Sequence, residues 1–145
     1  PAAVERNYRR VKADKDTGIQ PLLLDLTNPS PALGWAHREL LSLEERGPAD
    51  VLLALAVVHH LGIGHNLPLE RVAGFLATVG RNLVIEFVPK ADSQVQRLLA
   101  SRVDIFDSYT QDHFERAFST YFAIVEAVPV REGTRVIYVM RRREN

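Results

Sequence analysis

Three histidines form the densest group of side chains in this sequence that could carry chemistry. His59 and His60 are adjacent and directly follow an apolar run, and His65 comes shortly after them. A neutral imidazole can act as a general base, and three imidazoles can ligate zinc or nickel. In a structural alternative, one ring packs in the core and the other caps a loop. Neighbouring strand residues point to opposite faces, so one shared metal ion would need a bend in the chain.

Two carboxylates also lie at apolar segments. Glu86 lies within a strongly apolar stretch, where a carboxylate is costly unless it is paired. It either has a raised pKa and serves as a general base, or it pairs with a cation such as Arg81 or Lys90. Asp25 ends another apolar stretch, where it could bind a ligand donor or cap the turn that follows it.

The apolar pattern predicts the elements that position these groups. Continuous apolar runs over 21–26, 51–58 and 83–88 are typical of strands covered on both faces, as in a parallel sheet. We expect helices over 2–17, 36–46, 69–79 and 93–101, with Asp92 as an N-cap, and one more that begins near Thr110. Strands alternating with helices favour an α/β fold built from right-handed crossovers.

The end of the chain has a different pattern. Strands over 122–130 and 134–140 flank the Glu132-Gly133 turn, which predicts an antiparallel hairpin. The aromatic residues before and within it recur at near-helical spacing, and we expect them in the core: Tyr109, Phe114, Phe118 and Phe122. The predicted fold is therefore a mainly parallel sheet with a C-terminal antiparallel hairpin.

Composition narrows the class of partner. The 145 residues are 46% hydrophobic and 25% charged, as in a globular domain, with 18 basic and 18 acidic side chains. This balance gives no overall field for nucleic acid or an anionic membrane, and we interpret Arg141–Arg143 as a solvated tail. The longest apolar run, 51–58, is too short to span a bilayer. The absence of cysteine fits the reducing cytoplasm, which is the predicted location.

Three strand segments together resemble a known enzyme class. They are Leu24-Asp25-Leu26-Thr27-Asn28-Pro29, the run 49–61 with sequence ADVLLALAVVHHL, and the run 83–89 with sequence LVIEFVP. They look like the third, fourth and fifth strands of class I S-adenosylmethionine-dependent methyltransferases, and the closing hairpin resembles the last two strands of that fold. Within the class, the chain is most similar to a bacterial group described as nodulation-related or uncharacterised.

The resemblance implies a role for each residue at the strand ends. Asp25 would hold the adenine amino group of S-adenosylmethionine, with Leu26 against the ring. Leu55 and Ala56 would contact the methionine portion of the cofactor. His59, His60 and Glu86 would face an unidentified methyl acceptor, and the region 89–113 would form part of a lid.

The same comparison implies that the front of the domain is missing. The chain begins with a predicted helix, and it has no counterpart of the family's glycine-rich loop or of its ribose-binding carboxylate. We therefore expect residues 1–145 to be one N-terminally incomplete domain, inactive by itself. Strand 51–58 would lose a neighbour, and its exposed edge would favour self-association. The alternative hypothesis is a non-catalytic, methyltransferase-like interaction domain that associates through this edge.

Overall fold

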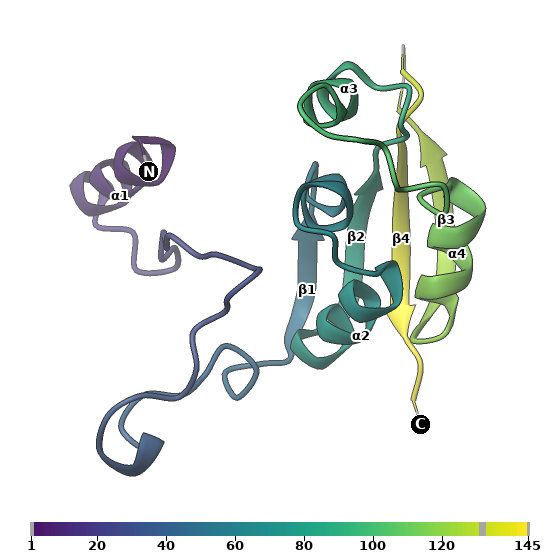
Figure 1. Cartoon of the computed structure of the whole chain (residues 1–145). Coiled ribbons are helices and arrows are strands. Elements are labelled where there is room, and N and C mark those ends of the chain that lie inside the picture. The colour runs from purple at the N-terminus through teal and green to yellow at the C-terminus, as the bar shows by residue number, and fades with distance from the viewer. Residues whose placement is uncertain (1, 131–132, 145) are drawn as a thin grey trace. The chain divides into compact units, whose positions relative to one another are not determined.

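The computed structural model describes residues 2–130 and 133–144, and they fall into two compact units, residues 1–30 and 31–145 (Figure 1). In the first unit, helix α1 (Ala2–Asp14) buries Val11 and leaves Tyr8 about half exposed. The amide of Asp16 donates to the carbonyl of Val11 just past the end of the helix. The predicted first helix is thus confirmed, and it ends slightly earlier than expected.

The second unit is a mixed α/β structure. Its elements are, in order, the 3₁₀ turn η1 (Trp35–His37), β1 (Ala49–Ala54), the π-helical turn η2 (His60–Gly64), α2 (Leu69–Val79), β2 (Gly80–Phe87), α3 (Ser93–Leu99), α4 (Gln111–Ser119), β3 (Phe122–Pro129) and β4 (Val136–Arg142). The predicted N-cap is confirmed, because the side chain of Asp92 accepts from the amide of Gln94. The helix predicted to begin near Thr110 is also confirmed, and the side chain of Thr110 accepts from the amide of His113.

The four strands among the described residues form one open sheet in the order β1-β2-β4-β3. β1 and β2 are parallel, whereas β4 is antiparallel to both of its neighbours, so β1, β2 and β3 run in one direction. The predicted hairpin is confirmed, although Glu132 of its turn lies outside the described residues. The expectation of a mainly parallel sheet is wrong, because two of the three strand pairings are antiparallel.

Two predicted elements are not formed. Residues 21–26 are not a strand, and Leu22 and Leu23 are exposed. A strand needs a partner for its N–H and C=O groups, and no described strand pairs with this segment. Residues 36–46 are not a helix, because Leu33 and Leu40 pair through their main chains and close a loop there.

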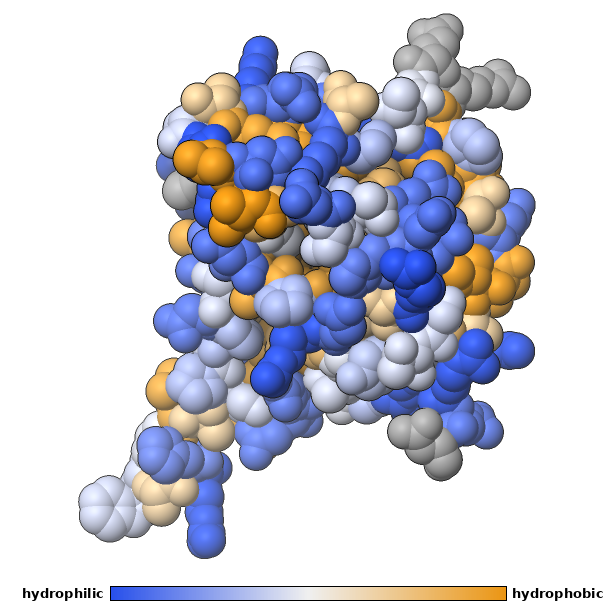
Figure 2. All heavy atoms as spheres, turned by 45° about the vertical axis from the view of Figure 1, so that its right-hand side comes forward, coloured by the Kyte–Doolittle hydropathy of each residue, from blue (hydrophilic) through white to orange (hydrophobic). Residues whose placement is uncertain are grey.

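Helices α2 and α4 cover one face of the sheet (Figure 1). The predicted aromatic core is confirmed: Phe114 and Phe118 of α4 and Phe122 of β3 are fully buried, and Tyr109 is nearly so. The other face lacks such a cover over β1, where Val51 is 55% and Leu53 70% exposed. Figure 2, turned so that the right-hand side of Figure 1 comes forward, shows apolar side chains reaching the surface in separate patches between polar ones.

No helix in the described part of the chain combines the length and the apolar character that crossing a membrane requires.

Candidate active site

The candidate site lies at the carboxyl ends of the parallel strands β1 and β2. Ala54 is the last residue of β1 and pairs with Ile85 of β2. Two residues later, Ala56 has a φ of 53°, in the left-handed region, and the chain leaves the sheet. The amide of His60 then donates to the carbonyl of Val57, which opens a helical turn. The strand predicted over 51–58 therefore ends four residues early, and the histidines lie on a turn.

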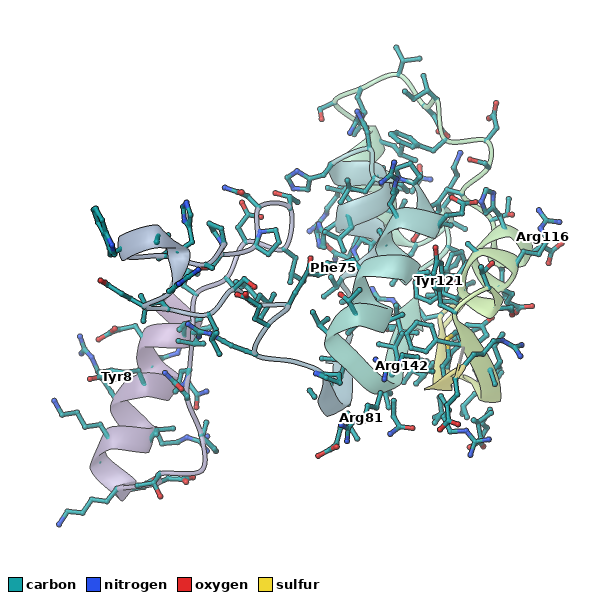
Figure 3. The ribbon with its side chains drawn as sticks, turned by 90° about the horizontal axis from the view of Figure 1, so that it is seen from below. Tyr8, Phe75, Arg81, Arg116, Tyr121 and Arg142 are labelled. Atoms are coloured by element: carbon teal, nitrogen blue, oxygen red, sulfur yellow. The ribbon has the colours of Figure 1, made fainter. Side chains whose placement is uncertain are left out.

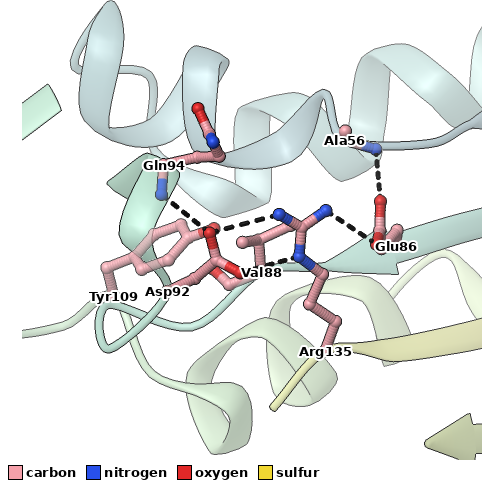
Figure 4. A network of polar contacts seen from close by, with 7 residues as sticks. All are labelled: Ala56, Glu86, Val88, Asp92, Gln94, Tyr109 and Arg135. Atoms are coloured by element: carbon pink, nitrogen blue, oxygen red, sulfur yellow. Dashed lines mark hydrogen bonds and ion pairs between the residues drawn. The ribbon is translucent and has the colours of Figure 1, made fainter. Parts of the chain in front are cut away.

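Glu86 of β2 holds this turn against the sheet (Figure 4). The residue is 9% exposed, and its Oε2 accepts a 2.7 Å hydrogen bond from the amide of Ala56. Its Oε1 accepts from Nη1 of Arg135 at 3.2 Å. Both carboxylate oxygens are thus occupied, which favours the paired role for Glu86 over the general-base role. The bond to Ala56 also stabilises a backbone conformation that a non-glycine residue rarely adopts.

Arg135 extends the contact to a third element. Its Nε and Nη2 donate to the two carboxylate oxygens of Asp92 at 2.7 and 3.2 Å, so the pair is bidentate. The same Asp92 caps helix α3 through the amide of Gln94. The hydrogen bonds with Arg135 lower the pKa of Asp92, and the pKa of Arg135 is raised in turn. One guanidinium therefore ties the ends of β2, β4 and α3 together.

The two adjacent histidines differ in environment. His59 is 1% exposed, and burial, reinforced by the positive potential of His60 and Arg135, lowers its pKa to about 4. Among the described residues, its Nδ1 has no hydrogen-bond partner. His60 is exposed, and its ring centroid lies 4.2 Å from that of His59. His59 is consequently neutral at pH 7, and His60 is the imidazole that a substrate can reach.

The histidines do not form a metal site in the described part of the chain. No three His, Asp or Glu side chains there are arranged to hold an ion. His65 lies beyond η2 and is exposed. The metal hypothesis for His59, His60 and His65 therefore has no geometric support.

The buried state of His59 makes stability depend on pH. Between pH 6.5 and about 4 the unfolded chain binds a proton at His59 that the folded chain does not bind. The stability that neutral His59 contributes is fully present above pH 6.5. It is lost as the pH drops toward 4, which lowers the free energy of unfolding by on the order of 2 kcal/mol. Urea unfolding from pH 7.5 to 4.5 measures this slope. His59→Phe should flatten it, whereas His60→Phe should keep most of it, because burial lowers the pKa of His59 more than His60 does; an unchanged slope in His59→Phe would contradict the assignment.

Side-chain hydrogen bonds and an ion pair hold the loop between α3 and α4 beside the site. Arg102 donates to the carbonyl of Ile63 at the end of η2 and to the side chain of Asn66. The ammonium of Lys90 contacts both carboxylate oxygens of Asp104 at 2.8 Å. The contacts of Arg102 attach part of the predicted lid region 89–113 to η2, the turn that carries His60, whereas the Lys90–Asp104 pair joins two parts of that region to each other.

Asp25 and Leu26 belong to the first unit, whereas Leu55, Ala56, His59, His60 and Glu86 gather in the second. The Oδ1 of Asp25 accepts from the amide and the hydroxyl of Thr27 at 2.9 and 2.7 Å. This is the turn-capping role that the sequence left open. A cofactor-binding role for Asp25 and Leu26 stays a prediction.

The sequence interpretation missed Arg135. It sought a partner for Glu86 nearby in the chain, but Arg81 pairs with Asp50 and Lys90 with Asp104. Arg135 directly precedes β4, which lies beside β2 in the sheet. An assumed antiparallel register between these two strands could have suggested Arg135.

Comparison with known proteins gives one informative relative. The chain is 43% identical over 145 residues to the nodulation protein NoeA of Rhizobium meliloti (strain 1021). The match covers 99% of this chain but 30% of that protein, so the chain spans less than a third of its relative's length. No family model matches the chain, and no solved structure matches it significantly.

Proposed function

We propose that this chain forms the carboxyl-terminal part of a class I S-adenosylmethionine-dependent methyltransferase domain. The observation that carries the proposal is the parallel pair β1–β2, whose carboxyl ends bring together Leu55, Ala56, His60 and Glu86. Ligands of open α/β sheets bind outside the carboxyl ends of the strands. The proposal is also supported by the β3–β4 hairpin, whose antiparallel β4 lies between β2 and β3, because the resemblance implies a closing hairpin at this end of the sheet.

The residues at the end of β1 fit the methionine portion of such a cofactor. Leu55 is 50% exposed and offers apolar contact, and the adjacent main chain at Ala56 is fixed by Glu86. S-adenosylmethionine, when bound, supplies a methyl group on a sulfonium centre. We propose that its binding is completed by protein segments that supply the glycine-rich loop and the ribose-binding carboxylate, which have no counterpart in residues 1–145.

The remaining residues either take part in the reaction of the methyl acceptor or position the groups that do. His60, exposed at the start of η2, accepts the proton of the methyl acceptor, and neutral His59 packs against its ring. Glu86 and Arg135 are positioning residues, because their polar atoms already have partners. Glu86 accepts from the amide of Ala56 and from Arg135, and Arg135 also donates to Asp92. Without cysteine in the sequence, we also propose a cytoplasmic location.

The test uses a chimera between this chain and its longer relative NoeA. The segment of NoeA that matches this chain is replaced by residues 1–145, and S-adenosylmethionine binding is measured by calorimetry. We expect NoeA and the chimera to bind with a Kd below about 100 μM, equivalent to about −5.5 kcal/mol, and the isolated chain to bind more weakly. Leu55→Asp should weaken binding by the chimera at least tenfold, whereas Leu53→Asp, within β1, should not. Absence of binding by NoeA and by the chimera would refute the proposal.

The exposed strand β1 supports a second candidate, a non-catalytic interaction domain. Among the described strands, β1 pairs with β2 alone, so its other edge has no strand partner there. Val51 and Leu53 are exposed beside that edge, as expected for a surface that pairs with a second copy. Light scattering tests this: a concentration-dependent dimer that Leu53→Lys abolishes supports it, and a stable monomer at high concentration excludes it.

A further inference from the structure

The arginines near the end of the chain are fixed in the fold and are not a solvated tail. Arg141 and Arg142 belong to β4, and the amide of Arg143 donates to the carbonyl of Tyr121 at 2.8 Å. The guanidinium of Arg142 donates to the carbonyl of Ala77, in the last turn of α2. The tail interpretation is therefore wrong for these residues, because main-chain contacts hold two of their side chains or amides in place.

The ends of two helices orient these cations. Arg142 contacts the last turn of α2, and the Nε of Arg143 donates to the carbonyl of Ser119, the last residue of α4. Cations are favoured at helix carboxyl ends, where carbonyls lack intrahelical partners. Each of these bonds uses one of the five guanidinium N–H groups, so the remaining donors stay available. The cations are thereby pre-organised, which lowers the entropy cost of binding an anion.

Two adjoining hollows surround these side chains. The first, of about 750 Å³, is lined by Arg81, Asn82, Ala123, Arg141, Arg142, Arg143 and Glu144. The second, of about 550 Å³, shares the last three of these and adds Gly74, Ala77, Thr78 and Tyr121. Figure 3, seen from below, shows Arg81, Arg142 and Tyr121 on this side of the second unit, with Arg116 pointing away from them.

The chemistry of the two hollows is complementary. Four guanidiniums line the first, against the carboxylate of Glu144 and that of Asp50, which contacts Arg81 at 3.2 Å. An excess of positive charge therefore remains, and guanidiniums bind phosphate oxygens through paired hydrogen bonds. In the second hollow Tyr121 is 39% exposed, so part of its ring is accessible for stacking on a planar group.

We propose that these joined hollows, at the amino-terminal end of β2 and thus away from the candidate active site, bind a nucleotide. The phosphate would contact Arg142 and Arg143, which line both hollows, and the base would stack on Tyr121. The nucleotide is either free or part of a single strand, since both present the same phosphate and base. This inference does not depend on the proposed methyl transfer.

Calorimetry on the full chain at low salt tests the site, with AMP, inorganic phosphate, adenosine and a single-stranded RNA hexamer as probes. We expect AMP to bind at least tenfold more tightly than phosphate or adenosine, and added salt to weaken it. A hexamer that binds more tightly than AMP assigns the site to a strand; equal affinity assigns it to a free nucleotide.

Matched variants locate the binding. Arg143→Ala removes an exposed side chain that lines both hollows, and it should weaken AMP binding at least tenfold. Tyr121→Leu should weaken AMP but not phosphate. Arg116→Ala, an equal loss of charge on the exposed side of α4, should leave both unchanged. The proposal is overturned if AMP binds no better than adenosine, or if Arg143→Ala and Arg116→Ala have the same effect.

Discussion

Replacement of Glu86 by leucine is expected to lower the free energy of unfolding by about 3 kcal/mol. The substitution removes the acceptor for the amide of Ala56 and one of the two carboxylate partners of Arg135. Glu86 is 9% exposed, so water replaces these contacts poorly. The left-handed conformation at Ala56 would lose its support at the same time. Urea unfolding at pH 7 measures the loss.

Two variants serve as controls for Glu86→Leu. Asp50→Ala breaks the exposed ion pair with Arg81, and such pairs contribute less than about 1 kcal/mol. Glu86→Gln keeps an oxygen that can accept from the amide of Ala56 and should lose less than Glu86→Leu. Equal losses in Glu86→Leu and Asp50→Ala would contradict the role assigned to Glu86.

Phe114→Ala is expected to cost about 3–5 kcal/mol, the largest effect of a single substitution that we predict. Phe114 is fully buried, and its ring lies 5.1 Å from Phe87 of β2 and 5.1 Å from Tyr138 of β4. Its removal leaves a cavity at the contact between α4 and the sheet. Thermal or urea unfolding measures the loss.

Phe75→Ala is the control for this prediction. Phe75 lies on α2 and is only partly buried, so the same truncation should cost clearly less. Similar losses for Phe75→Ala and Phe114→Ala would mean that the aromatic cluster around α4 does not form the centre of the core.

Local signals predicted much of the second unit. The apolar spacing of 69–79 predicted α2 with its observed bounds, the side chain of Asp92 caps α3 as expected, and α4 begins beside Thr110 as expected. These features depend on hydrophobic periodicity and on hydrogen bonds between near neighbours, and both are present in the sequence itself.

Elements that depend on distant partners were predicted less well. The apolar run 21–26 has strand composition but no paired strand in the described chain, and composition cannot supply hydrogen-bond partners. At 42–45, Ser42 and Glu45 form the reciprocal bonds of a capping box, but Gly47-Pro48 follows too soon for a helix. The end of β1 was misplaced because the turn at Ala56 depends on Glu86, thirty positions away.

The candidate site shows the same division. The sequence located His59 and His60 at the end of one apolar run and Glu86 within another, and the structure brings them to one edge of the sheet. The sequence could not show which of these residues can act on a substrate. Burial distinguishes His59 from His60, and the contact with Arg135 decides the role of Glu86. Burial and long-range ion pairs are properties of packing, so they appear only once the register of β4 against β2 is known.

The central claim is that Glu86 holds the main chain at the end of β1 and so fixes the proposed site. Hydrogen exchange at the amide of Ala56, followed by NMR, tests it most directly, because this amide donates to Oε2 of Glu86 at 2.7 Å. We predict exchange at least about 100-fold slower than in an unstructured chain, with most of the protection lost in Glu86→Leu but kept in Asp50→Ala. An unprotected amide in the natural chain, or protection that survives Glu86→Leu, would contradict the account.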